Sequence, residues 1–367
     1  MPITSRQLVA QINLSAMRHN LQRVREHAPS AQILAVVKAD AYGHGLKRVL
    51  PALDEADGLA LMELPAAIGL RENNYTRRIL LLEGFFDVEE LKAISHHRIA
   101  AVVHNHEQVR MLESTELERP LEVFLAVNSG MNRLGIKPDE TKAFCERLSM
   151  LPSVAALRLM THLGRAETKE GSADALARFE LACVGLPYPR SIANSAGVLR
   201  YRAIGGEIVR PGLMLYGASP IIDKPARLYG LQPVMSLRSE LIAVQDVAEG
   251  EYVGYGEVYR TTRASRIGVV ACGYADGYPI TARPGTPVYV SGKRAMIAGR
   301  VSMDMLTVDI TDIPEARPGS PVLLWGDGLP VDDVARWSGL ISYQLLCAVT
   351  PRVKFVTTEI GRVHFDL

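Results

Sequence analysis

The sequence is poor in cysteine, has no excess of either charge and contains no long hydrophobic run. Its four cysteines form no Cys-x-x-Cys pair, which excludes a disulfide scaffold and indicates buried thiols in a reducing compartment. Lysine and arginine number 41 against 40 acidic residues, so there is no basic surplus to bind a nucleic-acid backbone. No stretch approaches the ~18 apolar residues of a membrane span, and the N-terminus lacks the pattern of a secretory signal. We therefore expect a cytoplasmic protein that binds neither membranes nor nucleic acids.

What the chain does have is the composition of a globular protein. It contains 367 residues, of which 48% are hydrophobic and 22% are charged. Domains average roughly 100–200 residues, so about two domains are expected, and a barrel of about 250 residues with a smaller unit fits equally well.

Eight short apolar runs recur over the first 217 residues, on average about 25 residues apart. They are rich in Val, Ile and Leu and nearly continuous, which is typical of parallel strands buried on both faces. The runs begin at residues 33, 59, 79, 99, 121, 157, 191 and 208, and helix-like stretches lie at 46–56, 87–95, 106–114, 139–148 and 172–181. Asp87, Asp139 and Ser172 stand where helix N-caps belong. The alternation predicts an α/β fold with an N-terminal (β/α)8 TIM barrel over residues 8–225.

The sequence pattern changes after the last of these runs. Over residues 226–367 the chain carries short β-rich runs punctuated by Gly and Pro, with helical patterns only at 332–340 and 342–349. This pattern predicts a mainly β C-terminal domain. The strand-like segment at 8–15 could pair with either domain, so residues 1–10 could join the second one.

Functional residues of a barrel lie at the carboxyl ends of its strands. The first strand ends in Val36-Val37-Lys38. Partial burial disfavours the charged form of a lysine, which makes Lys38 a candidate amine nucleophile able to form a Schiff base. A lysine whose stem packs on the strand end while its amine reaches water is the alternative.

Other strand ends add groups of a complementary kind. The fifth strand leads to Arg133 on a glycine-flanked turn, and the sixth leads to His162. The seventh ends in Asn194-Ser195 and the eighth contains Arg210-Pro211-Gly212, where barrels commonly bind phosphate through backbone N–H groups and a hydroxyl. Together these residues suggest a phosphorylated cofactor held near an amine nucleophile.

The motif AVVKADAYGHG around Lys38 resembles that of the alanine racemases, which depend on pyridoxal 5′-phosphate (PLP). The likeness continues in order along the whole chain, through SGMNRLG, MTHLGRAE, ANSAG, VRPGLMLYG, VGYGEVYR, GYADGYP and GRVSMDM. The joint match is specific and implies a PLP-dependent racemase acting on L- and D-alanine.

The resemblance also implies roles for single residues. Lys38 would hold PLP and act as one of two acid/base groups, and Tyr255 would be the second base. His162 would hydrogen-bond that tyrosine, while Arg133 and the backbone of Met303 would bind the substrate carboxylate. Tyr274 would narrow the entrance. Arg210 would meet the pyridine nitrogen, and the residues that would hold the cofactor are Lys38, Tyr42, Asn194, Ser195, Arg210, Gly212, Leu213 and Tyr343.

In the family the second base reaches the lysine of the other subunit, so the resemblance implies a homodimer with composite active sites and a small amino-acid substrate. One position departs from many relatives. They carry a carbamylated lysine where this chain has Ala126, and that lysine steadies the arginine equivalent to Arg133. We expect a chloride, a water or a neighbouring side chain to fill this space. Asn128 also replaces a frequent aspartate.

Several alternatives stay open at this point. A racemase of broader specificity has the same chemistry, because one methylene changes discrimination by only ~1–3 kcal/mol. A PLP-dependent decarboxylase of the same architecture pairs the pyridine nitrogen with an acidic residue, which Arg210 argues against, and a non-catalytic PLP carrier would not need Tyr255. Supply of D-alanine for peptidoglycan and catabolism of alanine are not separated.

Other polar residues are interpreted more simply. His104-x-His106 has no accompanying ligand pattern, so we predict no metal site. Asp276 and Asp304 are assigned to turn or interface support rather than to catalysis. Arg165 and Arg300 either line an entrance or form surface ion pairs.

Overall fold

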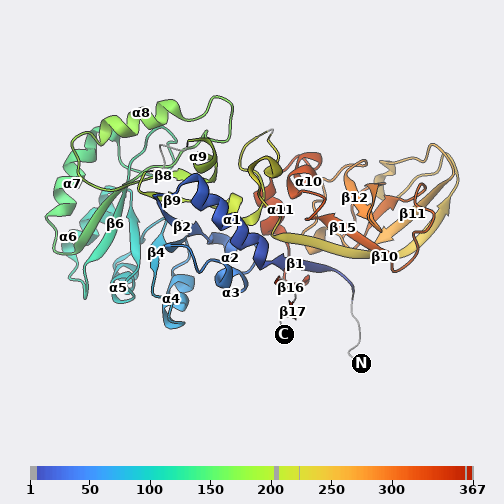
Figure 1. Cartoon of the computed structure of the whole chain (residues 1–367), viewed down its shortest axis with the longest axis horizontal. Coiled ribbons are helices and arrows are strands. Elements are labelled where there is room, and N and C mark those ends of the chain that lie inside the picture. The colour runs from blue at the N-terminus through green and yellow to red at the C-terminus, as the bar shows by residue number, and fades with distance from the viewer. Residues whose placement is uncertain (1–5, 202–205, 223, 360–361, 366–367) are drawn as a thin grey trace.

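The structure is a computed structural model that describes residues 6–201, 206–222, 224–359 and 362–365. Figure 1 shows a barrel at one end of the molecule and a β-sheet domain at the other. Eight parallel strands close the barrel in chain order: β2 (Gln32–Val36), β3 (Gly58–Leu61), β4 (Arg78–Leu81), β5 (Ala100–Val103), β6 (Leu121–Ala126), β7 (Val154–Met160), β8 (Arg190–Asn194) and β9 (Ile208–Arg210). Each strand lies within or beside one of the eight apolar runs, which confirms the predicted barrel.

Helices and short turns of helix precede, connect and follow the barrel strands. They are α1 (Leu14–His27), α2 (Lys38–Tyr42), α3 (Leu46–Val49), η1 (Leu50–Ala52), α4 (Leu64–Glu72), α5 (Val88–His96), α6 (His106–Ser114), η2 (Pro138–Glu140), α7 (Thr141–Ser149), α8 (Ala173–Ala182), α9 (Ser195–Arg200), η3 (Leu213–Tyr216) and η4 (Ala226–Tyr229). The helix expected at 46–56 is shorter than predicted, and it passes into the 3-10 turn η1 where Pro51 lacks the N–H that a continuing α-helix needs.

The three expected N-caps have different outcomes. Asp87 caps α5, because its side chain accepts a hydrogen bond from the backbone N–H of Glu90 at 2.8 Å. Ser172 occupies the cap position of α8, although its side chain makes no capping bond. The prediction for Asp139 is wrong, since this residue lies inside the 3-10 turn η2 and α7 begins at Thr141.

The second domain is built on a nine-stranded sheet in the order β11-β14-β13-β12-β15-β10-β1-β16-β17. Its strands are β1 (Val9–Asn13), β10 (Met235–Val247), β11 (Ser265–Val270), β12 (Pro287–Val290), β13 (Lys293–Ile297), β14 (Leu306–Asp309), β15 (Pro321–Trp325), β16 (Lys354–Glu359) and β17 (Arg362–Phe365). Strand β1 pairs antiparallel with β10 and parallel with β16. The N-terminal strand therefore belongs to the sheet of the second domain, and the mainly β character predicted for this domain is confirmed.

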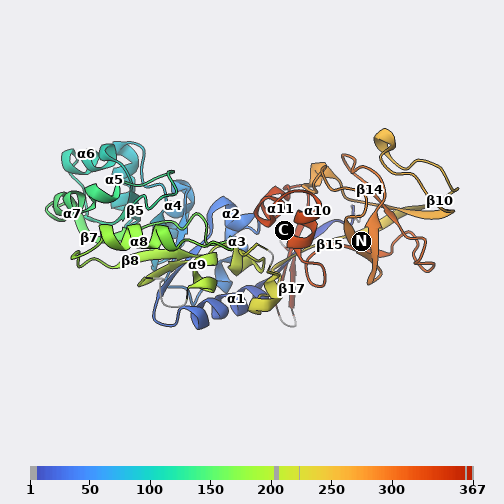
Figure 2. The same cartoon turned by 90° about the horizontal axis from the view of Figure 1, so that it is seen from above.

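Two helices, α10 (Val331–Trp337) and α11 (Ser342–Ala348), lie between the barrel and the sheet in both cartoon views (Figures 1 and 2). Helix α11 contacts α2, which directly follows the first barrel strand. Two short 3-10 turns complete this domain, η5 (Tyr255–Glu257) and η6 (Tyr274–Asp276). Buried apolar residues of both domains form one continuous hydrophobic cluster, so the second domain is packed firmly against the barrel near its first strand.

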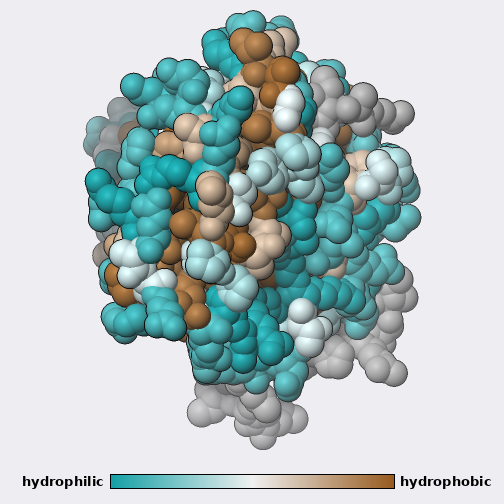
Figure 3. Space-filling view, turned by 90° about the vertical axis from the view of Figure 1, so that its left-hand side faces the viewer, coloured by the Kyte–Doolittle hydropathy of each residue, from teal (hydrophilic) through white to brown (hydrophobic). Residues whose placement is uncertain are grey.

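The outer surface of the barrel end is mixed in character. Figure 3 shows hydrophobic residues in a strip between hydrophilic ones on this face. Exposed large hydrophobic residues of the barrel include Met150, Leu181 and Val184, and scattered residues of this kind are common on folded proteins. Within the described residues, no helix is long and apolar enough to cross a membrane.

Candidate active site

A cavity of about 1110 Å³ lies at the carboxyl ends of the barrel strands and extends to α10 and α11. Its walls hold ten of the residues that the sequence singles out: Lys38, Tyr42, Arg133, His162, Asn194, Ser195, Arg210, Gly212, Leu213 and Tyr343. They are spread over more than 300 positions of the sequence. The closed parallel barrel brings them together because every strand delivers its carboxyl end to the same face.

Lys38 follows β2 and begins an unusual left-handed turn. Residues 39–42 all have φ between 48° and 54°, a conformation that costs a residue with a side chain roughly 1–2 kcal/mol. Local hydrogen bonds offset this strain: the ring Nδ1 of buried His44 lies 3.0 and 2.9 Å from the carbonyl oxygens of Ala41 and Tyr42, and Asp40 Oδ1 accepts from the N–H of Leu46 at 2.7 Å. The turn fixes half-buried Lys38 at the cavity wall.

Hydroxyl and backbone N–H groups converge on one side of the cavity. Buried Ser195 accepts hydrogen bonds at its Oγ from the N–H groups of Gly212 (2.7 Å) and Met214 (3.3 Å). A Cβ atom at Gly212 would lie 2.4 Å from the hydroxyl of Tyr42, so only glycine leaves room for this approach. Burial raises the pKa of Tyr42 well above its usual value and that of Tyr343 to about 12. Both phenols therefore remain protonated donors, and the set fits a phosphate group.

Arg210 supplies a buried positive charge. Its guanidinium donates to Ser191 Oγ at 2.5 Å and to the carbonyl of Thr161 at 2.6 Å. Burial lowers the pKa of Arg210 to about 10, which leaves it charged at neutral pH. Within the described residues, no carboxylate forms an ion pair with it. A buried cation without an acidic partner fits an uncharged ring nitrogen, and it does not fit a protonated one.

His162 is neutral in this environment. Burial, followed by the positive charges of Arg210, Arg133 and Lys38, lowers the pKa of His162 to about 3. Its imidazole therefore offers one donor and one acceptor nitrogen across the neutral pH range.

The loop after β6 carries Arg133 on the exposed rim of the cavity. The backbone of this loop is held by hydrogen bonds with two side chains, and the sequence motifs do not indicate this role for either of them. Asn128 Oδ1 accepts from the N–H groups of Gly130 (3.1 Å) and Asn132 (3.0 Å), and Arg178 Nε donates to the carbonyl of Ser129 at 2.7 Å. In the part of the chain that the structure describes, no group accepts a hydrogen bond from the Arg133 guanidinium.

Beside this loop, Ala126 is buried at the end of β6 and lines the same cavity. The hydroxyls of Ser129 and Thr161 form a buried hydrogen bond of 2.7 Å, and the carbonyl of Thr161 is the acceptor of Arg210. Neither the Ser129–Thr161 bond nor the Arg178–Ser129 bond could be predicted from a local sequence pattern, since each joins residues about 30–50 positions apart.

Three predicted residues lie elsewhere. Tyr255, Tyr274 and Met303 occupy loops of the second domain and do not line the cavity. These residues are 71%, 39% and 53% exposed, which is high for two tyrosines and a methionine. Within one chain the structure therefore does not bring them to Lys38.

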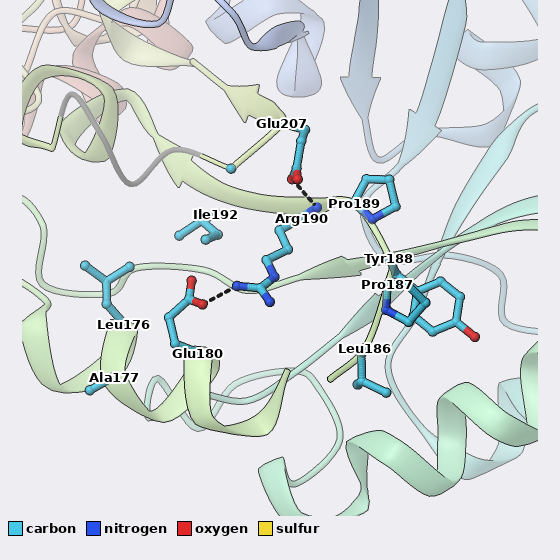
Figure 4. A pocket seen from close by; sticks show the side chains of 11 residues that line it. Leu176, Ala177, Glu180, Leu186, Pro187, Tyr188, Pro189, Arg190, Ile192 and Glu207 are labelled. Carbon is cyan, nitrogen blue, oxygen red and sulfur yellow. Dashed lines mark hydrogen bonds and ion pairs between the residues drawn. The ribbon is translucent and has the colours of Figure 1, made fainter. Parts of the chain in front are cut away.

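A second cavity, of about 750 Å³, opens at the amino ends of β8 and β9 (Figure 4). Arg190 lies at its centre: the guanidinium is paired with Glu180, and the backbone N–H donates to Glu207 at 2.6 Å. Residues at this end of a barrel serve stability rather than catalysis, so we assign the ion pair a structural role. In the described part of the chain, no group of three or more His, Cys, Asp or Glu residues could hold a metal ion.

Comparison with known proteins gives a consistent family. The alanine racemase N-terminal domain matches residues 12–220, and the alanine racemase C-terminal domain matches residues 234–357. The chain is 50% identical over 356 residues to the alanine racemase of Nitrosospira multiformis, with 96% of this chain and 100% of the relative covered. It is 49% identical over 354 residues to the catabolic alanine racemase of Klebsiella aerogenes, with 96% and 99% covered.

Solved structures agree with the sequence relatives. The biosynthetic alanine racemase of Pseudomonas aeruginosa superposes with a TM-score of 0.94 at 47% identity, covering 96% of this chain and 100% of that one. A structure of alanine racemase from Bartonella henselae with covalently bound pyridoxal phosphate gives a TM-score of 0.85 at 26% identity, with the same coverage. The chain therefore belongs to the alanine racemase family, the isomerases that interconvert L- and D-alanine.

Proposed function

We propose that this protein racemises alanine with PLP held in the barrel cavity and with two bases on opposite faces of the substrate Cα. The observation that carries the proposal is the division of the predicted residues between the two regions. Lys38 lies in a cavity that fits a phosphorylated cofactor, whereas Tyr255 is exposed on the other domain. A racemase needs a proton removed from one face and returned on the other, which one lysine cannot do alone.

The cavity residues divide the binding of the cofactor among them. Ser195, Tyr42, Tyr343 and the Gly212 N–H would hold the phosphate, with Asn194 and Leu213 beside them, and Lys38 would hold the cofactor covalently. PLP, when bound, supplies an electron sink that acidifies the Cα–H bond. Arg210, charged at neutral pH, would keep the ring nitrogen unprotonated, which weakens that sink and disfavours side reactions such as transamination.

The chain's own groups then handle substrate and protons. Arg133 and the backbone N–H of Met303 would bind the substrate carboxylate, and Tyr274 would narrow the entrance. Lys38 Nζ would exchange a proton at one face of Cα, and the Tyr255 hydroxyl would do so at the other. A phenol has an ordinary pKa of about 10, so Tyr255 must be assisted at neutral pH. Neutral His162 can supply a hydrogen bond to it.

We further propose that Tyr255 acts in the cavity of a second copy, which makes the protein a homodimer with composite sites. Exposed apolar residues lie beside both parts of the proposed site. Leu134 and Ile222 line the barrel cavity. Val258 and Met305 are close in sequence to Tyr255 and Met303. Two-fold dimers are the commonest soluble oligomers, and each copy of such a dimer can complete the other's site.

The position of Ala126 leads to a smaller proposal. Because no described group accepts a hydrogen bond from Arg133, we propose that a chloride, a water or a neighbouring side chain lies beside it. A crystal structure grown in bromide, with its anomalous signal, tests for the anion. Clear density for none of the three, with Arg133 disordered, contradicts the proposal.

The reaction itself is tested with labelled solvent. The purified protein incubated with L-alanine in D2O should produce D-alanine with deuterium at Cα, and an absorbance band near 420 nm should report bound PLP. Release of CO2 would select the decarboxylase. Serine and larger amino acids, assayed in parallel, distinguish an alanine racemase from one of broader specificity.

The cellular role follows from genetics rather than from chemistry. One relative is named catabolic and one solved neighbour is named biosynthetic, at similar identity. We propose a cytoplasmic enzyme that either supplies D-alanine for peptidoglycan or serves alanine catabolism. A deletion strain that requires D-alanine for growth indicates the first role, and one that fails only to grow on alanine indicates the second.

A further inference from the structure

Two exposed loops of the second domain are joined by a cluster of ionic contacts outside the cavity. The first loop carries Tyr274 and the second carries Met303. Their backbones are hydrogen-bonded to each other, with Tyr274 N–H donating to Ser302 O at 3.0 Å and Ala275 N–H donating to Met303 O at 3.0 Å. A Cβ atom at Gly273 would lie 2.3 Å from Met303 O, so the loops approach closely enough that only glycine fits there.

Each loop ends in an aspartate, and both aspartates face the same two arginines. Asp276 is only 1% exposed and lies 3.0 Å from the Arg6 guanidinium and 2.9 Å from that of Arg352. Asp304, 47% exposed, lies 2.6 Å from Arg352 and 3.8 Å from Arg6. Arg6 also donates to the backbone carbonyl of Asp304. Each arginine thus bridges the two loops.

The cluster also determines the shape of the first loop. Asp276 Oδ2 accepts from the Gly273 N–H at 2.8 Å and closes the turn that presents Tyr274. The carbonyl of Asp276 accepts from the N–H of Thr350, two residues before Arg352. A buried carboxylate is tolerated only when it is paired and hydrogen-bonded. Removal of an arginine therefore leaves the Asp276 carboxylate poorly paired and loosens the loop that this carboxylate holds.

We propose that Arg352 and Arg6, through Asp276 and Asp304, are positioning residues that fix Tyr274 and Met303 for the active site of the partner subunit. The inference rests on the proposed composite site, because that proposal gives the two loops their roles at the entrance and at the substrate carboxylate. None of the four residues lines the barrel cavity. They act on substrate binding through the loops, so their loss affects the KM for alanine more than kcat.

The test uses mixed dimers, isolated by two different affinity tags, in which only one site retains Lys38. In the trans arrangement, one chain carries Lys38→Ala with Arg352→Met and the other chain is unchanged. In the cis arrangement, one chain carries Lys38→Ala and the other carries Arg352→Met. The working site is built on the chain that keeps Lys38 in both cases, and only the chain that carries Arg352→Met differs.

We expect the KM for L-alanine to rise about tenfold in the trans dimer and to stay within twofold in the cis dimer, with kcat changed less than KM in both. The 420 nm absorbance of the working site should be unchanged. Arg352→Lys retains one ion pair but cannot bind two carboxylates at once, so its KM should lie between those of the unchanged protein and of Arg352→Met. Arg263→Met, which removes an exposed ion pair to Asp312 (2.6 Å) in the same domain, should have no effect.

The outcomes separate the two proposals. An unchanged KM in both arrangements overturns the positioning role and leaves the composite site intact. A raised KM only in the cis dimer overturns the composite site, since the loops would then serve their own chain. If Arg352→Met does not fold, Asp304→Asn breaks the same bridge at a half-exposed carboxylate and gives the same contrast.

Discussion

The barrel cavity and the loops of the second domain differ in how fully each is built within one chain. In the cavity, Tyr42, Ser195 and Arg210 are buried and hydrogen-bonded or packed against neighbours. In the loops, Tyr255 and Met303 are more than half exposed. One chain thus builds the proposed cofactor site completely and the proposed substrate site only in part, which is why we assign the loops to a second copy.

The largest effect that sharpens this comparison is expected from Lys38→Ala. The side chain that would hold the cofactor covalently and serve one face of Cα is then lost, so we expect the 420 nm band to disappear and activity to fall at least about 10⁴-fold. Absorbance of the purified protein and polarimetry of alanine check this. A variant that retains both the band and the activity would contradict the assignment of the cavity.

Tyr255→Phe should affect the other region alone. PLP should stay bound, and racemisation should slow about 10²–10⁴-fold in both directions, because the equilibrium constant between enantiomers is one. Exchange of the Cα hydrogen with D2O should survive for the enantiomer served by Lys38 and fail for the other, as followed by NMR. Equal loss of exchange for both enantiomers would argue against two bases on opposite faces.

Gly212→Ala should act on the cofactor side and leave the loops untouched. The new Cβ atom would meet the Tyr42 hydroxyl at 2.4 Å, so the tyrosine must move away from the phosphate position. We expect PLP affinity to fall about tenfold, equivalent to ~1.4 kcal/mol, with kcat at saturating PLP changed less. Ser219→Ala, on the same cavity wall but away from this contact, is the matched control.

The smallest effect concerns stability in acid. The pKa of His162 is lowered to about 3, below the ~6.5 of an unfolded histidine. The unfolded chain therefore binds a proton that the folded chain excludes, so this stability is present above about pH 6.5 and is lost as the pH falls toward 3. His162→Gln should reduce the pH dependence of the free energy of unfolding by ~1.4 kcal/mol per pH unit in that window. Denaturant titrations of the variant and of the unchanged protein at several pH values between 3 and 7 check this, and identical slopes would contradict it.

Much of the barrel could be predicted from the sequence, for a physical reason. Parallel strands buried on both faces appear as continuous apolar runs, and residues that follow such runs collect at one face of a closed barrel. This pattern identifies Lys38, His162 and Arg210 as candidates. Tyr343 lies in helix α11, whose sequence pattern alone predicts no role in the site, and only the family motifs indicate it.

Other features could not be predicted from the local sequence. In the left-handed turn at residues 39–42, Asp40 tolerates the conformation but Ala39, Ala41 and Tyr42 disfavour it, so the folded surroundings must enforce it. The contact of Arg6 with Asp276 spans 270 positions. The sequence suggested only turn or interface support for Asp276 and Asp304. The pairing of β1 with the second sheet brings Arg6 to these aspartates and to Arg352, and no local pattern predicts that pairing.

Complementation between variants decides whether two chains complete each site. Chains carrying Lys38→Ala and Tyr255→Phe are co-expressed with different tags, and the mixed dimer is purified. We expect it to regain about half of the wild-type activity per dimer, because one site then receives an intact lysine and an intact tyrosine from different chains. A double variant paired with a wild-type chain should be nearly inactive. The reverse result, an inactive first dimer and a half-active second one, would show that Lys38 and Tyr255 of each site come from the same chain.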